Sequence, residues 1–369
     1  MIKIEESDKP DEDWDKRVLE ADGFLYQTAR YAEYMKEALG MKLLFLTAKD
    51  RSTGRIVGQL AVHFGPLFCK YLKDKHENLF KIFSKFFKVY HFIKGPVIFD
   101  KSLKKEIYEE FIKYLDTLGK KAFMLQDISL PIYEDEEIYE IFKKYGFYSD
   151  SWGTVLVDTT KSEEELWQCL IKSRRNIVRR GINQGLVVKE AVSKEDYDKV
   201  IKIIEDMSNR NQVFAYPKEY YHIFFETLSK GNNIKTFFIE KDGQGIATVS
   251  VYLFGKRAIQ ALPAHTDYSI KQKISGTDFL EWYIIKWCHD NGYNTYDLSG
   301  IRPESTDQKE IGIREYKMRW GGQVITYPYF SKVYSRFKGE IANFMRKVYK
   351  GQKIKKNELS KPYEKDQLT

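Results

Sequence analysis

Apolar residues recur with helical or strand spacing along most of the chain, and the elements that they predict form two similar series. The first series contains a helix over 24–40, strands over 42–47 and 56–63 joined by a turn at 51–54, a turn and strand over 94–98, a helix over 103–118, a strand over 122–126 and a short helix over 135–145. Thr28 is a suitable N-cap for the first helix, and Gly40 is a suitable residue to end it.

The second series begins near Trp152 and follows a comparable order. It contains a strand over 154–157, a helix that starts at a capping box over 162–165 and continues through 180, a strand over 186–190, helices over 194–210 and 219–229, strands over 234–240, 245–254 and 258–262, a helix over 276–290 and a strand over 296–298. Residues from Ser331 onward predict a basic amphipathic helix. Since 369 residues are many for one domain, we expect two α/β domains, 1–150 and 151–324.

The segment 79–93 has an aromatic face and a basic face if it is helical. The aromatic face carries Phe83, Phe86 and Phe87, and lysines lie mostly opposite. Such a helix suits a membrane surface. The alternative is a helix that packs on the sheet of the first domain, with its lysines in solvent.

Charge and cysteine content narrow the classes of function. The chain has 61 Lys and Arg against 53 Asp and Glu, a net charge of +8, which fits an enzyme whose substrate carries phosphates and does not demand a polyanionic partner. Its 3 cysteines lie far apart with no metal-ligand spacing, which indicates a reducing, cytoplasmic setting. No apolar run approaches the ~20 residues of a spanning helix, so we expect a soluble protein or a peripheral one at the inner membrane face.

Common catalytic signatures are missing from the sequence. There is no P-loop, no HExxH string and no recognisable nucleophilic triad. Acyl-CoA enzymes hold the pyrophosphate on a glycine-rich turn that opens a helix. The two nearest strings are 273–278, where Asp278 stands in the way of a phosphate, and 51–56, which joins two strands. Both argue against ordinary acetyl-CoA use.

The stretch 296–322 carries the best candidate chemistry. Tyr316 and Lys317 precede the pair Gly321-Gly322, so an aromatic surface and a positive charge stand together at a bend. A fixed ammonium can stabilise a developing anion, and an aromatic ring can stack on a nucleotide base. The alternative interpretation is a surface lysine beside a half-buried tyrosine.

A second cluster of cations lies at 173–180. Arg175 and Arg179 are four residues apart and share a helical face, so both could contact phosphates. The same arginines would also complement the dipole at the end of a long helix, which is the structural alternative.

Several strings, in order along residues 24–330, resemble the Fem-type peptidyltransferases, which extend cell-wall precursors using aminoacyl-tRNA. The strings are Tyr26-Gln27, Tyr34-Met35-Lys36, 94–97, Gln126-Asp127, Leu166-Trp167, 173–177, 185–188, 296–300 and Tyr316-Lys317 ahead of Gly321-Gly322. The resemblance implies two tandem GCN5-acetyltransferase-like domains, each a mixed sheet flanked by helices. It also implies that residues 325–369 return to the first domain as a C-terminal helix.

The resemblance also assigns roles by motif position. Lys36 and Arg210 correspond to residues that hold precursor phosphates, and we add Arg175 and Arg179 to that set. Lys317 resembles the lysine that stabilises the tetrahedral intermediate.

Four further residues complete the predicted site. Tyr316 stands where the family has a phenylalanine that stacks on the tRNA acceptor end, and Arg319 lies beside it. Asp127 resembles an acidic residue once considered a base, and Tyr216 is an additional polar contact. No metal and no cofactor are expected, because aminoacyl-tRNA is the co-substrate.

The expected activity is therefore aminoacyl-tRNA-dependent transfer of an amino acid to an amine of a nucleotide- or lipid-linked cell-wall precursor, by a monomer. One alternative is an N-acyltransferase of the same fold that uses an acyl thioester and another small amine. Another is a non-enzymatic membrane- or RNA-binding module, with 79–93 as the membrane contact.

Overall fold

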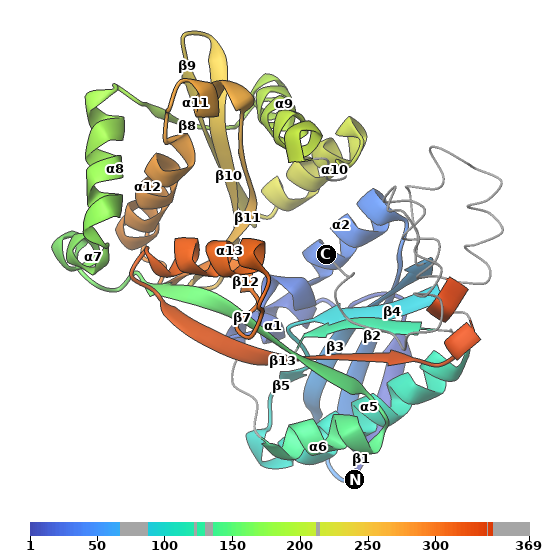
Figure 1. The fold of residues 1–369 in the computed structure, drawn as a ribbon. Coiled ribbons are helices and arrows are strands. Elements are labelled where there is room, and N and C mark those ends of the chain that lie inside the picture. Colours follow the sequence, from blue (N-terminus) through green and yellow to red (C-terminus); the bar gives the residue numbers. More distant parts are fainter. Residues whose placement is uncertain (67–87, 122–123, 130–135, 212–214, 338, 342–369) are drawn as a thin grey trace. The chain divides into compact units, whose positions relative to one another are not determined.

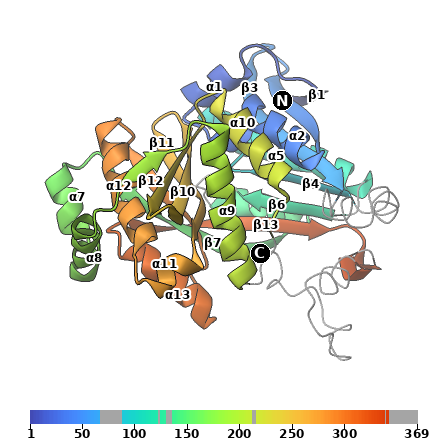
Figure 2. The same ribbon diagram turned by 90° about the horizontal axis from the view of Figure 1, so that it is seen from above.

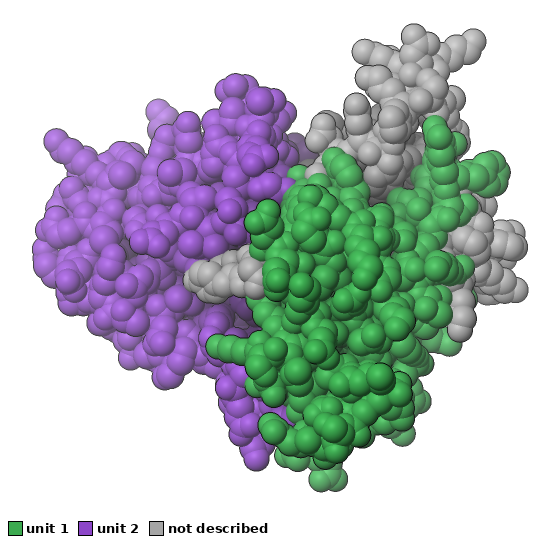
Figure 3. All heavy atoms as spheres, turned by 90° about the horizontal axis from the view of Figure 1, so that it is seen from below, with its two compact units in different colours: residues 1–13, 39–150, 329–369 green, residues 14–38, 151–328 purple. Residues whose placement is uncertain are grey.

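The computed structural model describes residues 1–66, 88–121, 124–129, 136–211, 215–337 and 339–341 (Figure 1). The chain forms two compact units, coloured separately in Figure 3. Unit 1 comprises Met1–Asp13, Leu39–Asp150 and Tyr329–Thr369, and unit 2 comprises Trp14–Ala38 and Ser151–Pro328.

Unit 1 is built on a mixed sheet in the strand order β1-β2-β3-β4-β6-β13. Its strands are β1 (Ile2–Ser7), β2 (Lys42–Asp50), β3 (Ile56–Pro66), β4 (Lys88–Ile93), β6 (Met124–Ser129) and the end of β13 (Gln323–Val333), while the short β5 (Val97–Ile98) pairs with β3. Strands β4 and β6 are parallel, and the other neighbours are antiparallel. The unit also contains the 3-10 turn η2 (Lys101–Leu103) and the helices α5 (Lys104–Lys121) and α6 (Glu136–Lys144).

Helix α5 contributes one face to the core of unit 1, because its apolar residues recur every three or four positions and so lie on one side of the helix. Ile107, Phe111 and Leu115 are fully buried in one cluster with residues of the sheet. From β13, Phe330 adds its ring to this cluster and stacks on Phe142 of α6 at a centroid distance of 4.0 Å. Strand β13, the last one among the described residues, is therefore part of the core of unit 1.

Unit 2 has the strand order β7-β12-β11-β10-β9-β8, in which β11 and β12 are parallel. Its strands are β7 (Tyr148–Asp158), β8 (Val188–Glu190), β9 (Ile234–Lys241), β10 (Gln244–Phe254), β11 (Arg257–His265) and β12 (Thr295–Ile301). Its helices are α1 (Trp14–Glu20), η1 (Leu25–Gln27), α2 (Ala29–Leu39), α7 (Glu163–Cys169), α8 (Lys172–Asn183), α9 (Lys194–Asn211), α10 (Lys218–Ser229), α11 (Asp267–Lys271), α12 (Gly276–Asp290) and α13 (Gln308–Met318). Figures 1 and 2 show α9 and α10 on one face of this sheet and α7, α8 and α12 on the other.

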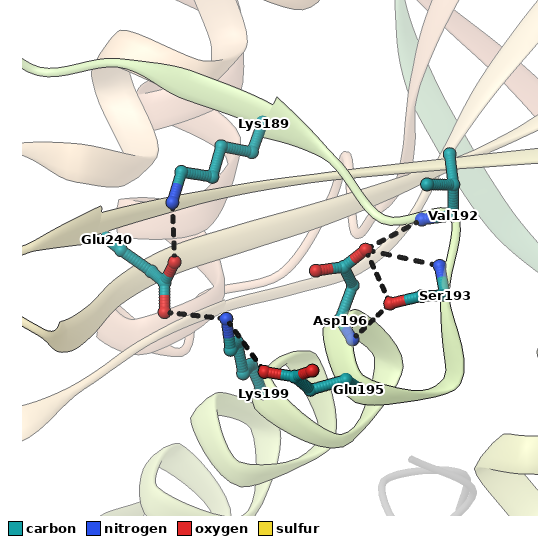
Figure 4. A network of polar contacts seen from close by, with 7 residues as sticks. All are labelled: Lys189, Val192, Ser193, Glu195, Asp196, Lys199 and Glu240. Carbon is teal, nitrogen blue, oxygen red and sulfur yellow. Dashed lines mark hydrogen bonds and ion pairs between the residues drawn. The ribbon is translucent and has the colours of Figure 1, made fainter.

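The edge of this sheet at β8 carries paired charges (Figure 4). Lys189 of β8 donates to Glu240 of β9 at 2.8 Å, and Lys199 of α9 lies 3.5 Å from the same carboxylate. Asp196 accepts from the Ser193 backbone N–H at 3.1 Å and so caps α9. Charged side chains along an edge strand discourage pairing with another chain.

The segment 14–38 lies in unit 2, whereas the sequence prediction placed it in the first domain. Aromatic side chains explain the difference, because Tyr31 contacts Tyr252 of β10 at a centroid distance of 6.3 Å. Arg257 of β11 also pairs with Asp22 and lies 4.7 Å above the ring of Phe24. Contacts distant in sequence decide this placement.

The helix predicted from 162 through 180 is two helices. The capping box is confirmed, with Ser162 and Glu165 each bonded to the other's backbone N–H. Helix α7 then ends at Cys169, and α8 begins at Lys172, because Leu170 and Ile171 are extended with ψ of 138° and 152°. The arginines therefore lie in α8, not in the distal half of one long helix.

One further predicted helix is wrong where the structure describes it, and another begins later than predicted. Residues 88–93, the end of the predicted basic helix, form strand β4. The rest of that segment lies outside the described residues, as does its predicted membrane contact. Ser331–Val333 end strand β13, which brings the chain into unit 1, and helical residues follow only from 336 in the described part of the predicted C-terminal helix.

Asp116 of α5 anchors this last strand and offers a test of the fold. It accepts from Lys332 at 2.6 Å and from Tyr334 at 3.0 Å, and it is 8% exposed. We expect Asp116→Asn to lower the free energy of unfolding by about 2 kcal/mol, because the half-buried Lys332 loses its charged partner. Urea denaturation measures this change.

A matched control lies on the same helix. Glu110 pairs with Lys113 at 3.3 Å on the surface, so Glu110→Gln should change stability by less than about 0.5 kcal/mol. Equal effects of the two substitutions would contradict the anchoring role of Asp116.

Candidate active site

Lys317 lies in the last turn of α13, in unit 2. The helix is N-capped by Asp307, which accepts from the backbone N–H groups of Lys309 at 2.8 Å and Glu310 at 3.1 Å. The half-buried Lys317 Nζ donates to the carbonyls of Gly300 at 2.8 Å and Ser299 at 3.2 Å. Because an ammonium has three protons, one remains to donate to a further acceptor.

An irregularity in β12 presents those two carbonyls to Lys317. The pairing of β12 with β7 shifts between Asp297 and Gly300, and Ser299 adopts a left-handed φ of 64°. The Asp297 carboxylate stabilises this bend by accepting from the Ser299 N–H at 2.6 Å. The Thr154 hydroxyl lies within hydrogen-bond distance of Asp297 and of the Ser299 carbonyl, at 3.0 Å from the latter. Side chains of β7 and β12 thus fix the position of the lysine.

Two carboxylates act on the charge of Lys317. Burial lowers the pKa of Lys317, and the carboxylates of Asp297 and Glu281 oppose that change. Glu281 of α12 is fully buried and accepts from Tyr296 at 2.9 Å and from the amide of Gln260. Burial raises the pKa of Glu281 to about 7, against the opposing effects of Tyr296 and Lys317.

The ring of Tyr316 is half-buried in unit 2. The guanidinium of Arg174 lies 4.5 Å from its centroid, and Trp320 meets it edge-on at 6.2 Å. Arg174 is 6% exposed and pairs with Asp278 of α12. These contacts favour a packing role for Tyr316 and cover one face of the ring predicted to stack on a nucleotide.

The predicted phosphate-binding arginines of α8 differ in their surroundings. Arg175 donates to the carbonyls of Leu170 at 2.6 Å and Gln168 at 3.2 Å, so it caps the end of α7. Arg179 is exposed and lies 5.3 Å from the ring of Trp167. Only Arg179 of the two presents its charge mainly to solvent.

Lys36, Arg210 and Tyr216 lie on elements of unit 2 that contact one another. Lys36 is exposed on α2, and α2 joins α10 through a hydrogen bond from Thr227 to Glu37 at 2.9 Å. Arg210, in the last turn of α9, donates to Asp267 at 3.0 Å. Tyr216 lies just before α10.

A row of tyrosines links this region to the surroundings of Lys317. Tyr26 meets Tyr31 at a centroid distance of 5.1 Å, and Tyr31 meets Tyr34 at 5.5 Å. The hydroxyls of Tyr34 and Tyr220 are hydrogen-bonded, and Tyr220 stacks on Tyr216 at 3.7 Å. We call these five residues the tyrosine row.

The charge of Asp297, the acid that supports the bend in β12, acts on Tyr26 of the tyrosine row. Burial raises the pKa of Tyr26, and the charge of Asp297 adds to that rise. Asp297 therefore interacts with both Lys317 and the tyrosine row. Of the predicted site residues, Tyr216 belongs to the tyrosine row and Lys317 interacts with the same acid, whereas Lys36, Arg175, Arg179 and Arg210 have other surroundings.

Two predicted residues lie apart from these contacts. Arg319 is exposed and pairs with Glu315 at 3.3 Å. Asp127 lies in β6 of unit 1, and its side chain is outside the described part of the chain. Among the described residues, no cluster of His, Cys, Asp and Glu could hold a metal ion, and no helix is long and apolar enough to span a membrane.

Comparisons with known proteins agree with this architecture. A family model described as an acetyltransferase (GNAT) domain matches residues 172–318. A UDP-N-acetylmuramoylpentapeptide-lysine N(6)-alanyltransferase from Weissella viridescens is 21% identical over 262 residues, which are 63% of this chain and 73% of that protein. The crystal structure of FemX superposes with a TM-score of 0.69 at 13% identity, covering 89% of this chain and 97% of that one. This chain is similar to the Fem-type transferases.

A tandem GNAT protein from the clavulanic acid pathway also matches this chain, with a TM-score of 0.56 at 10% identity over 91% of this chain and 99% of that protein. The predicted fold class, two tandem GNAT-like domains of α/β type, is confirmed. The chain is accordingly an enzyme of the acyl- or aminoacyltransferase class.

The sequence prediction missed Glu281, although a signal exists. Glu281, Ile285 and Cys288 are spaced i, i+4, i+7 on the buried stripe of α12. An acidic residue on such a stripe must find partners inside the protein, because an unpaired buried charge is costly. That spacing marks Glu281 as an unusual carboxylate.

The turn after α13, the helix that carries Lys317, provides a test of how closely this part of the chain packs on β7. A Cβ on Gly322 would lie 2.7 Å from the Leu156 carbonyl oxygen and 2.6 Å from Val155. We expect Gly322→Ala to lower the free energy of unfolding by about 1–3 kcal/mol, because backbone of β7 must move. Thermal and urea unfolding measure the loss.

Gly312, in the middle of the same helix, is the control. A Cβ there meets nothing within 4 Å, so Gly312→Ala should stabilise the protein by about 0.5–1 kcal/mol through helix propensity. A loss of stability in Gly312→Ala would contradict the open space around Gly312 on α13.

Proposed function

We propose that this Fem-type protein transfers an amino acid from aminoacyl-tRNA to an amine of a cell-wall precursor. The observation that carries the proposal is the Lys317 ammonium, held by two carbonyls with one proton left to donate. The alanyltransferase relative, whose name specifies a UDP-N-acetylmuramoylpentapeptide-lysine acceptor, supports this class of acceptor.

The proposed reaction needs positioning and charge stabilisation more than a nucleophile from the protein. The acceptor amine forms a bond to the carbonyl carbon of the aminoacyl ester, and negative charge develops on the carbonyl oxygen. Lys317 donates its remaining proton as a hydrogen bond to that oxyanion. The tetrahedral intermediate then breaks its C–O bond to the terminal ribose of the tRNA, and the amine proton passes to the leaving oxygen directly or through water. An ester is already activated, so no covalent enzyme intermediate is required.

The proposed substrate contacts follow from motif position and exposure. Lys36 and Arg210 would hold precursor phosphates, with Tyr216 and the tyrosine row beside them. Arg179 and Arg319, both exposed, would contact phosphates of the precursor and of the tRNA acceptor end respectively. Aminoacyl-tRNA would enter as a co-substrate, and no other cofactor is invoked.

Removing the Lys317 charge tests the catalytic role. We expect Lys317→Met to lower kcat by about 10²–10³ while leaving the far-UV circular dichroism spectrum intact, because one oxyanion donor is lost. The assay is mass spectrometry of a UDP-linked pentapeptide precursor incubated with charged tRNA. Lys309→Met, an exposed lysine of the same helix, should retain wild-type turnover. Wild-type turnover in Lys317→Met would remove that residue from the mechanism.

Dependence on tRNA separates the proposal from the thioester alternative. Pretreating the charged tRNA with ribonuclease should abolish transfer, since the donor can no longer be held through its nucleotides. Ribonuclease blocked with its inhibitor before addition is the control. Undiminished product from an aminoacyl thioester after the same treatment would instead favour an N-acyltransferase of this fold.

A further inference from the structure

Two cations on one face of α13 hold the segment that connects β12 to this helix. Lys317 donates to the two carbonyls of the bend in β12. One turn earlier, Arg314 donates to the carbonyls of Arg302, at 3.2 Å, and Pro303. Residues three apart on a helix are neighbours on its surface. The two cations therefore hold four carbonyls within residues 299–303.

These polar contacts matter because α13 has little apolar anchorage. None of its 11 residues is buried, whereas a surface helix normally turns an apolar stripe toward the core. Its half-buried stripe runs through Ile311, Arg314 and Lys317, so cations take two positions that apolar residues usually fill. Tyr316 and the buried Trp320 attach the end of the helix to the core of unit 2. The middle of the helix is therefore held in large part by Arg314.

The opposite side of the same segment is fixed by β7. A Cβ on Gly300 would lie 3.1 Å from the Trp152 ring. A Cβ on Gly153 would lie 2.8 Å from the ring of Pro303. The guanidinium of Arg302 lies 4.0 Å from the centroid of the Trp152 ring. Because β7 leaves the segment little room to move away, the donors from α13 set where the helix lies along it.

We propose that Arg314 is a positioning residue that fixes α13 on residues 299–303 and thereby aims the third proton of Lys317 at the oxyanion, without touching substrate itself. The inference rests on the proposed role of Lys317 as the oxyanion donor. A donor stabilises a developing charge best when its position is fixed before the charge appears. A misplacement of about 1 Å can cost about 10²-fold in rate.

Removing the donors of Arg314 should loosen Lys317 with little change in the fold. Methionine keeps an unbranched side chain at this position, and the carbonyls of the half-buried Arg302 and Pro303 can bind water instead. In Arg314→Met we expect kcat to fall about tenfold or more, because Lys317 is no longer aimed. KM for charged tRNA and for the precursor should stay within about twofold of wild type.

The direct readout is the Lys317 ammonium itself. In 15N-lysine-labelled protein without substrate, the hydrogen bonds to two carbonyls should slow proton exchange enough for its 1H–15N signal to be observed. Lys317→Arg assigns that signal by removing it. We expect Arg314→Met to lose the signal through faster exchange, whereas a role of Arg314 in stability alone would leave it in place.

Two further variants complete the comparison. Arg314→Lys keeps a cationic donor, so it should retain the Lys317 signal and recover kcat to within about threefold of wild type. Lys309→Met removes an exposed cation of the same helix and should change neither the signal nor kcat.

An unchanged Lys317 signal in Arg314→Met would overturn the inference. A wild-type signal too weak to observe would do so as well, because the hydrogen bonds would then not hold the ammonium. If Arg314→Met does not fold, Arg314→Gln replaces it, since its shorter side chain stays polar but cannot reach both carbonyls. A retained Lys317 signal in that variant would overturn the inference equally.

The spectroscopic readout needs no substrate and so separates this inference from the proposed function. Loss of the Lys317 signal in Arg314→Met, together with no amino-acid transfer by the wild-type protein, would support the positioning and reject the reaction. Transfer by the wild type with a Lys317 signal independent of Arg314 would do the reverse.

Discussion

The hydrogen bonds from Lys317 to two carbonyls of β12 are the constraint on which the site depends. Those carbonyls point at the lysine because β12 is irregular at Ser299, where the backbone takes a left-handed conformation. A non-glycine residue in that conformation needs support from its surroundings. Asp297 and Thr154 provide it. The left-handed conformation of Ser299 thus orients the two carbonyls that hold the Lys317 ammonium in place.

The partial burial of the Lys317 ammonium makes the charges around it the second constraint on the site. In a region of low polarity, each charge must be matched, and the structure matches them in neighbouring sets. Arg174 is paired with Asp278, and Lys317 interacts with Asp297 and Glu281. Elsewhere in the described part of the chain, Asp116 and Lys332 form another largely buried pair, and many ion pairs lie on the surface, where they contribute little. Such a concentration of buried charge is typical of a functional site.

Much of the architecture could be predicted because local pattern and tertiary environment agree. The spacing of Ile107, Phe111 and Leu115 predicts α5, and the structure buries that face. The break between α7 and α8 could not be read in this way, since Leu170 and Ile171 continue an apolar pattern through extended backbone. The assignment of 14–38 to the second unit depends on aromatic contacts far apart in sequence. Lys317 was predicted from its motif, whereas the partners of Glu281, Tyr296 and Gln260, are brought together only by the fold.

The division of unit 1 along the chain has a consequence for biosynthesis. Its strand β1 is made before any of unit 2, but the part of β13 that carries the core ring of Phe330 is made only after the whole of unit 2. Unit 2 can therefore close on the ribosome while unit 1 waits with an unpaired edge at β6. A nascent chain stalled before Tyr329 would hold one finished domain and one open sheet, a form that chaperones would have to shield.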